Sequence, residues 1–213
     1  ASAHGAPCKI LMVPYATPAE DLENGLMLCG LDIPDIRGTQ STYFSLSDQY
    51  TEMKNVAGGV ELPLRFQGDT ATISIPGLRN PRVRKSFIEA PLNLTVDRQA
   101  HTATVEVQGK TVNLAAGKWS GWLEWTFQVT PSYAVRAVSR FWPVQIGEHV
   151  RIYMTCLQVH PKAPMLRIST PPEYAGQVAD RYGLHKTVGW AYDTKALQHD
   201  AITEDAYIAD ENE

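Results

Sequence analysis

Residues 91–115 read PLNLTVDRQAHTATVEVQGKTVNLA, with an apolar side chain at nearly every second position of each segment. Successive side chains of a β-strand point to opposite faces, so this alternation indicates strands with one face in a core and one in water. Gln108 and Gly109 interrupt the alternation, which resumes with Val112 and Leu114. A short interruption containing Gly is typical of a tight hairpin. The stretch therefore predicts neighbouring antiparallel strands.

The same alternation recurs across residues 58–158, with turn signals at 67–69 and 97–99. Antiparallel sheets commonly keep one face solvated, which fits this pattern better than a parallel sheet does. The predicted fold class is mainly β, an antiparallel sandwich or a partly closed barrel, with a few short helices at the ends. The positions expected to face the core include Leu62, Leu64, Ile73, Val105, Trp125 and Ile152.

The two ends of the chain differ from this body. The apolar run at residues 9–13 predicts a strand buried on both faces, as in a parallel sheet covered by helices. Thr17 and Pro18 predict the start of a short helix that continues to about Leu28. No repeated strand and helix units follow to complete such a sheet. The N-terminal end therefore suggests a piece of a larger α/β protein.

At the C-terminal end, the pattern predicts a helix over residues 173–182 that Gly183 closes. Thr203 has the character of an N-cap, because two acidic residues follow it in the first turn. The predicted division is an N-terminal segment at 1–40, an antiparallel β domain at 41–160, and a helix and loop segment at 161–213 that returns to the N-terminal segment.

Composition restricts the possible partners. The chain of 213 residues is 44% hydrophobic and carries a formal net charge of −4, so no general attraction to nucleic acid or anionic lipid is expected. Positive charge gathers locally at residues 79–85, where a solvated loop is the favoured interpretation. The sequence contains no apolar run of about eighteen residues, so it predicts no membrane-spanning helix. The three cysteines form no CxxC motif, and their pairing and the compartment stay open.

Several stretches, in order along the chain, resemble one family. They are KILMVPYATP and GLDIPDIRGT near the start, then WSGWLEWTF, VRAVSRFW, IYMTCLQVHPKAPMLRISTPPEYAGQVADRYG and DTKAL. Together they resemble the type I phosphodiesterase and nucleotide pyrophosphatase family of the alkaline phosphatase superfamily, from residue 9 to about residue 207. One departure is Thr170, which stands where the family pattern has a His before the Pro pair.

The resemblance implies a parent enzyme whose α/β catalytic domain holds two metal ions, usually zinc, and a Thr or Ser nucleophile. It also implies that these groups lie outside the segment seen here, in the two halves of the catalytic domain. This chain would then be the β-rich inserted region, with no catalytic residue and no metal ligand of its own. The expected partners are the remainder of the catalytic domain and a phosphate ester substrate.

Three residues are candidates for substrate contact. Arg37 follows Asp32 and Asp35 closely, either in a polar turn that the carboxylates cap or at a rim where Arg37 reaches a phosphate. Asp193 and Lys195 lie in the DTKAL stretch and either cap a local turn or shape the same rim. Because both ends of an inserted domain join one host, the two stretches are expected on the same side of the β body.

Two other function classes have less support in the sequence. A stand-alone β-sandwich that binds a glycan or a protein would require several outward aromatic side chains, and Trp122 is the one that the alternation supports. A complete small hydrolase would require a nucleophile with its base or a paired metal motif, and no such set can be assembled. The histidines are expected on the surface or in loops, and His160, which precedes Pro161, is the most notable of them.

Overall fold

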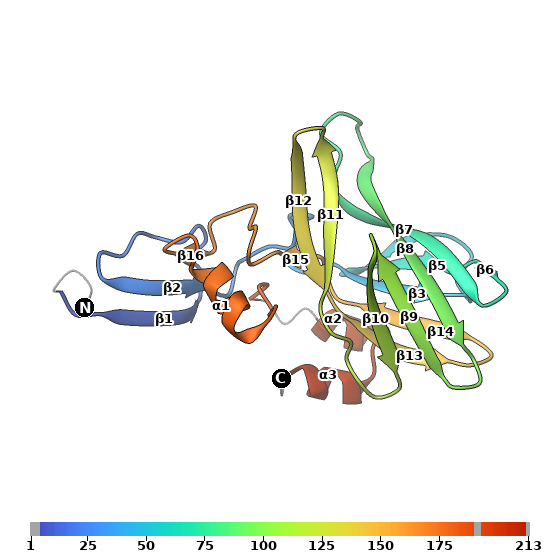
Figure 1. Cartoon of the computed structure of the whole chain (residues 1–213). Helices are drawn as coiled ribbons and strands as arrows, with labels where there is room; N and C mark the ends of the chain where they lie inside the picture. Colours follow the sequence, from blue (N-terminus) through green and yellow to red (C-terminus); the bar gives the residue numbers. More distant parts are fainter. Residues whose placement is uncertain (1–4, 190–192, 212–213) are drawn as a thin grey trace.

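A computed structural model describes residues 5–189 and 193–211. Its main body contains a five-stranded antiparallel sheet in the order β10-β9-β8-β7-β6 (Figure 1). The strands are β6 (Phe66–Gln67), β7 (Thr70–Arg79), β8 (Phe87–Asp97), β9 (Thr102–Val107) and β10 (Lys110–Ala115). The predicted hairpin joins β9 to β10, with positive φ angles of 52° at Gln108 and 80° at Gly109. The quoted stretch thus folds as its alternation predicts.

A second five-stranded sheet has the order β13-β14-β3-β5-β4. Its strands are β3 (Tyr43–Ser47), β4 (Lys54–Val56), β5 (Gly59–Pro63), β13 (Phe141–Ile146) and β14 (Val150–Met154). The β3–β5 pair is parallel, whereas the other pairs of this sheet are antiparallel. A third sheet joins β11 (Leu123–Thr130), β12 (Tyr133–Ser139) and β15 (Gln158–Val159).

One hydrophobic core lies between these sheets. Side chains from β7 to β11 join those of β3, β5, β13 and β14 in a single buried cluster. The six positions that were predicted to face the core are all buried: Leu62, Leu64, Ile73, Val105, Trp125 and Ile152. The mainly β fold is therefore confirmed, and its sheets do not close into a barrel within the described residues.

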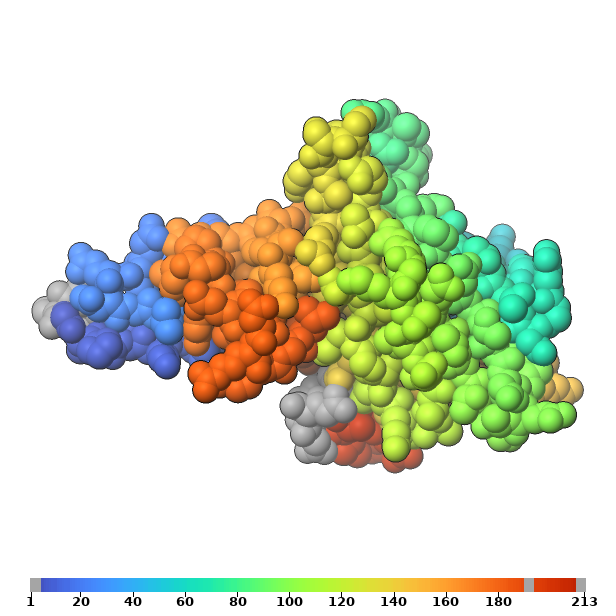
Figure 2. Space-filling view, in the orientation of Figure 1, coloured from blue at the N-terminus to red at the C-terminus, as the bar shows by residue number. Residues whose placement is uncertain are grey.

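A small three-stranded sheet extends from this body (Figure 1, Figure 2). It pairs β1 (Cys8–Val13) in parallel with β2 (Gly25–Cys29), which in turn pairs with β16 (Ser169–Thr170). We call these three strands the arm. The predicted helix from Thr17 to Leu28 was wrong, because residues 25–29 pair on both edges as a strand. Short helices are marginal on their own, so strand pairing with distant residues prevails.

The expectation that residues 9–13 are buried on both faces was also wrong for this chain. Ile10, Leu11 and Met12 are 41%, 60% and 48% exposed. β1 lies at the edge of the arm, where it has β2 as its one strand neighbour among the described residues. Strand β1 therefore has the apolar composition of a buried strand, but its side chains at residues 10–12 are exposed to solvent.

Three short helices complete the structure. α1 (Tyr174–Tyr182) lies beside the arm and ends at Gly183, as predicted. α2 (Asp193–Gln198) and α3 (Glu204–Glu211) cover the second face of the β13–β4 sheet, where Tyr43, Trp142 and Tyr153 meet helix residues such as Ala196. The Thr203 hydroxyl accepts the Ala206 N–H at 3.3 Å, which confirms the predicted N-cap of α3. None of the described helices is long and apolar enough to cross a membrane.

Candidate functional site

Asp35 organises the loop that begins with GLDIPDIRGT. Its carboxylate accepts the backbone N–H groups of Arg37, Thr39 and Thr42 at 2.9–3.0 Å and the Thr39 hydroxyl at 2.5 Å. The side chain is buried, and burial raises the pKa of Asp35 against the effect of these hydrogen bonds. The Asp35 carboxylate thus holds the loop together, and both of its oxygens accept hydrogen bonds from residues of that loop.

Arg37 packs against aromatic rings. Its guanidinium carbon lies 4.7 Å from the ring centroid of Phe87 and 5.5 Å from that of Phe44. Nε and Nη1 are buried and have no hydrogen-bond partner among the described residues. Burial lowers the pKa of Arg37, and the charge of Arg79 lowers it further, whereas Asp35 opposes both. The aromatic contacts therefore hold the Arg37 guanidinium in place near the charge of Arg79, and two of its nitrogens remain without a hydrogen-bond partner among the described residues.

Lys195 and the end of the Asp35 loop line one surface pocket of about 510 Å³. The lining residues are Thr39, Gln40, Ser41, Thr42, Gly58, Thr194, Lys195 and Gln198. We call this the Lys195 pocket. Its walls bring two segments distant in sequence to the same side of the β body, as the sequence analysis expected. Most of the lining side chains are hydroxyls, amides and one ammonium, which suit a polar or anionic ligand.

Gly58 makes room for Lys195. A Cβ atom at residue 58 would overlap the Lys195 side chain, and the φ angle of +81° at Gly58 disfavours any other residue. Gly59, the next residue, is covered in the same way by the Tyr43 ring. The two glycines thus fix where the lysine stem and the helix α2 approach the sheet.

The three predicted site residues do not all meet. Arg37 lies on the aromatic rings rather than among the residues that line the Lys195 pocket. Asp193 begins α2, but its side chain falls outside the described residues. Asp32 has a φ angle of 96° and a buried Oδ1 without a described partner. No group of three or more His, Cys, Asp or Glu side chains suitable for a metal ion occurs within the described residues.

A charge network is centred on Glu124 of the third sheet. Glu124 pairs with Arg136 of the neighbouring strand β12 and also with Lys110 at 2.5 Å. His160 is buried, faces Glu124 through Nε2 at 3.0 Å, and accepts the Lys162 N–H at Nδ1. The hydrogen bond from Lys110 is the largest cause that lowers the pKa of Glu124 to about 2. The positive and negative groups of this network pair with one another, which favours a role in stability.

The aromatic side chains around Arg140 are engaged as well. The Arg140 guanidinium lies 4.4 Å from the Trp119 ring centroid and 5.3 Å from that of Trp122. The Trp119 indole N–H donates to the Ala206 carbonyl at 3.1 Å, which ties α3 to the body. Trp122 thus covers a buried arginine, and this use of the ring weakens the case for a sugar platform.

No family model matches this chain, and neither a curated protein nor a solved structure matches it.

Proposed function

We propose that this chain is the β-rich inserted domain of a larger metal-dependent phosphohydrolase, one that resembles the type I phosphodiesterase and nucleotide pyrophosphatase family. In this proposal the domain shapes substrate access, and the nucleophile and the two metal ions belong to the rest of the protein. The observation that carries the proposal is strand β1, an apolar edge strand in a parallel pair with both faces uncovered.

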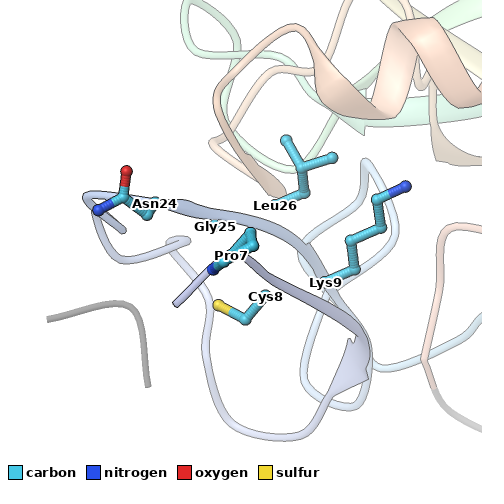
Figure 3. Close-up of a pocket in the computed structure, with 6 residues that line it drawn as sticks. All are labelled: Pro7, Cys8, Lys9, Asn24, Gly25 and Leu26. Atoms are coloured by element: carbon cyan, nitrogen blue, oxygen red, sulfur yellow. The ribbon is translucent and has the colours of Figure 1, made fainter. Parts of the chain in front are cut away.

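Parallel sheets occur almost only where helices cover both faces. An exposed apolar edge strand also offers unpaired N–H and C=O groups to another strand. The start of the arm also carries a surface pocket of about 580 Å³, which is lined by Pro7, Cys8, Lys9, Asn24, Gly25 and Leu26. Lys9 and Leu26 extend to one side of the paired strands and Cys8 to the other (Figure 3). These features fit a sheet that continues into a covering α/β domain.

The order of the chain supports an insertion. The arm contains β1 and β2 from the beginning of the chain and β16 from beyond the β body. The body therefore departs from the arm and returns to it, as a domain inserted into one host does. In this proposal the chain supplies no metal ligand: the Asp35 oxygens accept hydrogen bonds within their own loop, and the Thr170 hydroxyl donates to the Glu20 carbonyl. The proposal accordingly routes no chemical step through this chain.

Lys195 has the main part in substrate contact. It lines a polar pocket together with threonine and serine residues, where its ammonium would suit an anionic group of a phosphate ester. Asp193 starts the same helix and would shape the rim. Arg37 would add a positive charge behind the Asp35 loop and would not contact the substrate directly.

The test uses the full-length protein that contains this chain, assayed with zinc and a nitrophenyl phosphodiester. Lys195→Ala should lower kcat/KM about tenfold, the loss expected for one charge-assisted hydrogen bond. The unfolding midpoint should stay unchanged. Lys118→Ala removes an exposed lysine outside the Lys195 pocket and serves as the matched control.

Two results would contradict the proposal. One is a flanking reading frame that encodes neither a nucleophile motif before this segment nor an Asp-His-Gly motif after it. The other is a full-length protein without zinc-dependent hydrolysis of the diester. An equal loss of activity in the Lys195 and Lys118 variants would remove the substrate role of Lys195 specifically.

A further inference from the structure

The loop between β7 and β8 is ordered by its own hydrogen bonds. It stands at the top of the body, beside the hairpin of β11 and β12 (Figure 1). The Asn80 side-chain oxygen accepts the Arg82 N–H at 2.9 Å, and the Asn80 N–H donates to the Ser86 carbonyl at the same distance. The Ser86 hydroxyl closes the turn on the Val83 carbonyl at 3.0 Å. The cationic side chains of residues 79–85 thus start from a defined backbone.

Three of these cations surround a pocket. A hollow of about 410 Å³ is lined by Arg79, Asn80, Arg84, Lys85, Ser86 and Phe87. We call it the basic pocket. Arg79 and Phe87 are directly paired across β7 and β8, so their side chains project to the same face. The lining contains three positive charges, two polar groups, one aromatic ring and no carboxylate.

Arg37 adds a fourth positive charge to this region. Its guanidinium lies on the ring of Phe87, which lines the pocket, and it is near enough to Arg79 for the two charges to interact. No carboxylate within the described residues forms an ion pair with Arg37, Arg79, Arg84 or Lys85. The nearby carboxylate of Asp35 is occupied by its own loop. The Asp35 carboxylate offsets part of the Arg37 charge, but the excess positive charges still repel one another, and a bound anion reduces that repulsion.

We propose that the basic pocket binds a phosphate group, either of a soluble phosphate compound or of a lipid headgroup. Arginine forks match phosphate oxygens in a bidentate geometry, and Arg79 and Arg84 supply two such forks. The volume lies within the roughly 300–1,000 Å³ range of small-ligand sites. Phe87 provides an apolar wall for the group that carries the phosphate. This site is distinct from the Lys195 pocket and requires no catalytic partner.

Binding is measured on the chain of 213 residues by titration calorimetry, with pyrophosphate in 150 mM sodium chloride as the probe. Arg79→Ala and Arg84→Ala should each weaken binding about tenfold or more, since hydrogen bonds to charged groups carry factors of this size. Arg82→Ala is the matched control, because Arg82 belongs to the same loop but not to the pocket lining. It should weaken binding less than about threefold, as a distant screened charge would.

A second arm distinguishes the two sources of phosphate. Sedimentation with phosphatidylcholine vesicles is compared with sedimentation with vesicles that also contain 5% phosphatidylinositol bisphosphate. Saturable pyrophosphate binding, or vesicle binding that requires the phosphoinositide, supports the site when Arg84→Ala weakens it about tenfold or more and Arg82→Ala weakens it less than about threefold. Absence of binding in both arms overturns the proposal. Equal losses in the Arg82 and Arg84 variants also overturn it, because they indicate a diffuse charge effect. Hydrolytic activity does not enter either readout, so this result is independent of the Lys195 test.

Discussion

The β body buries its apolar residues, as β2 of the arm does through Met27, Leu28 and Cys29, whereas β1 of the arm leaves its apolar residues in water. In the body, alternate side chains such as Leu94 and Val105 lie in a closed core. In the arm, Leu11 and its neighbours are apolar and remain exposed. Burial of apolar area drives folding, so an apolar strand left in water contributes little to the stability of this chain. The contrast separates the buried side chains of the body from the exposed apolar side chains of β1.

The largest effect expected from this contrast is at Trp125. Its ring is fully buried, stacks with Phe127 at 6.1 Å between centroids, and donates from Nε1 to the Ser139 hydroxyl at 2.8 Å. Trp125→Ala should lower the free energy of unfolding by about 3–5 kcal/mol in urea titrations. A loss below about 1 kcal/mol would mean that the body is not the stable unit.

A smaller effect tests the charge network of the body. The folded pKa of Glu124 is about 2 against an ordinary value of 4.5. A lowered folded pKa stabilises the protein above the unfolded pKa, so this contribution should disappear as the pH falls from about 5 to about 2. Its size should be about 1 kcal/mol, because solvent screens the partly exposed pairs with Lys110 and Arg136.

Unfolding measured across that pH range checks the expectation. Glu124→Gln should flatten the pH dependence, whereas Glu106→Gln, a change on the neighbouring sheet, should leave it in place. Identical pH profiles for the wild type and the Glu124 variant would show that the network contributes nothing measurable.

The smallest effect is expected in the arm. Leu11→Ala should change the free energy of unfolding of the chain by less than about 0.5 kcal/mol, because surface substitutions rarely do more. In the full-length protein the same substitution should cost about 2–5 kcal/mol if a covering domain buries Leu11. Comparison of the two proteins by urea titration sharpens the contrast. A large loss in the chain alone would show that the arm is already a packed element.

The sequence predicts the body better than the arm for a physical reason. Period-two alternation is local, so residues such as Ile73, Val105 and Trp125 could be assigned to the core without knowledge of their neighbours. Strand pairing is not local: nothing in residues 43–63 marks β3 and β5 as parallel partners. The N-cap signal at Thr17 and Pro18 predicted a helix to about Leu28, and no local pattern shows that residues 25–29 pair with strands at residues 8–13 and 169–170.

The candidate site divides in the same way. Lys195 was expected on the side of the Asp35 loop, and the shared pocket places it there. The role of Asp35 in holding its loop together fits one of the two interpretations offered for its turn. The stacking of Arg37 depends on Phe44 and Phe87, which approach it only in the folded sheets. No pattern within residues 30–39 reports that contact, and none reports that Lys110 and His160 join Arg136 at Glu124.

The pairing of Met27 with Thr170 has a consequence for the order of folding. Loop-closure entropy grows with the length of the intervening chain, and contacts between distant residues slow folding. Once the β body has formed, the effective length between β2 and β16 shrinks, so we expect the arm to assemble last. During synthesis β1 and β2 leave the ribosome long before residue 170 does. Strand β2 therefore remains without its partner β16 while β1 and β2 are already exposed, and chaperone binding to nascent chains should concentrate on residues 8–29.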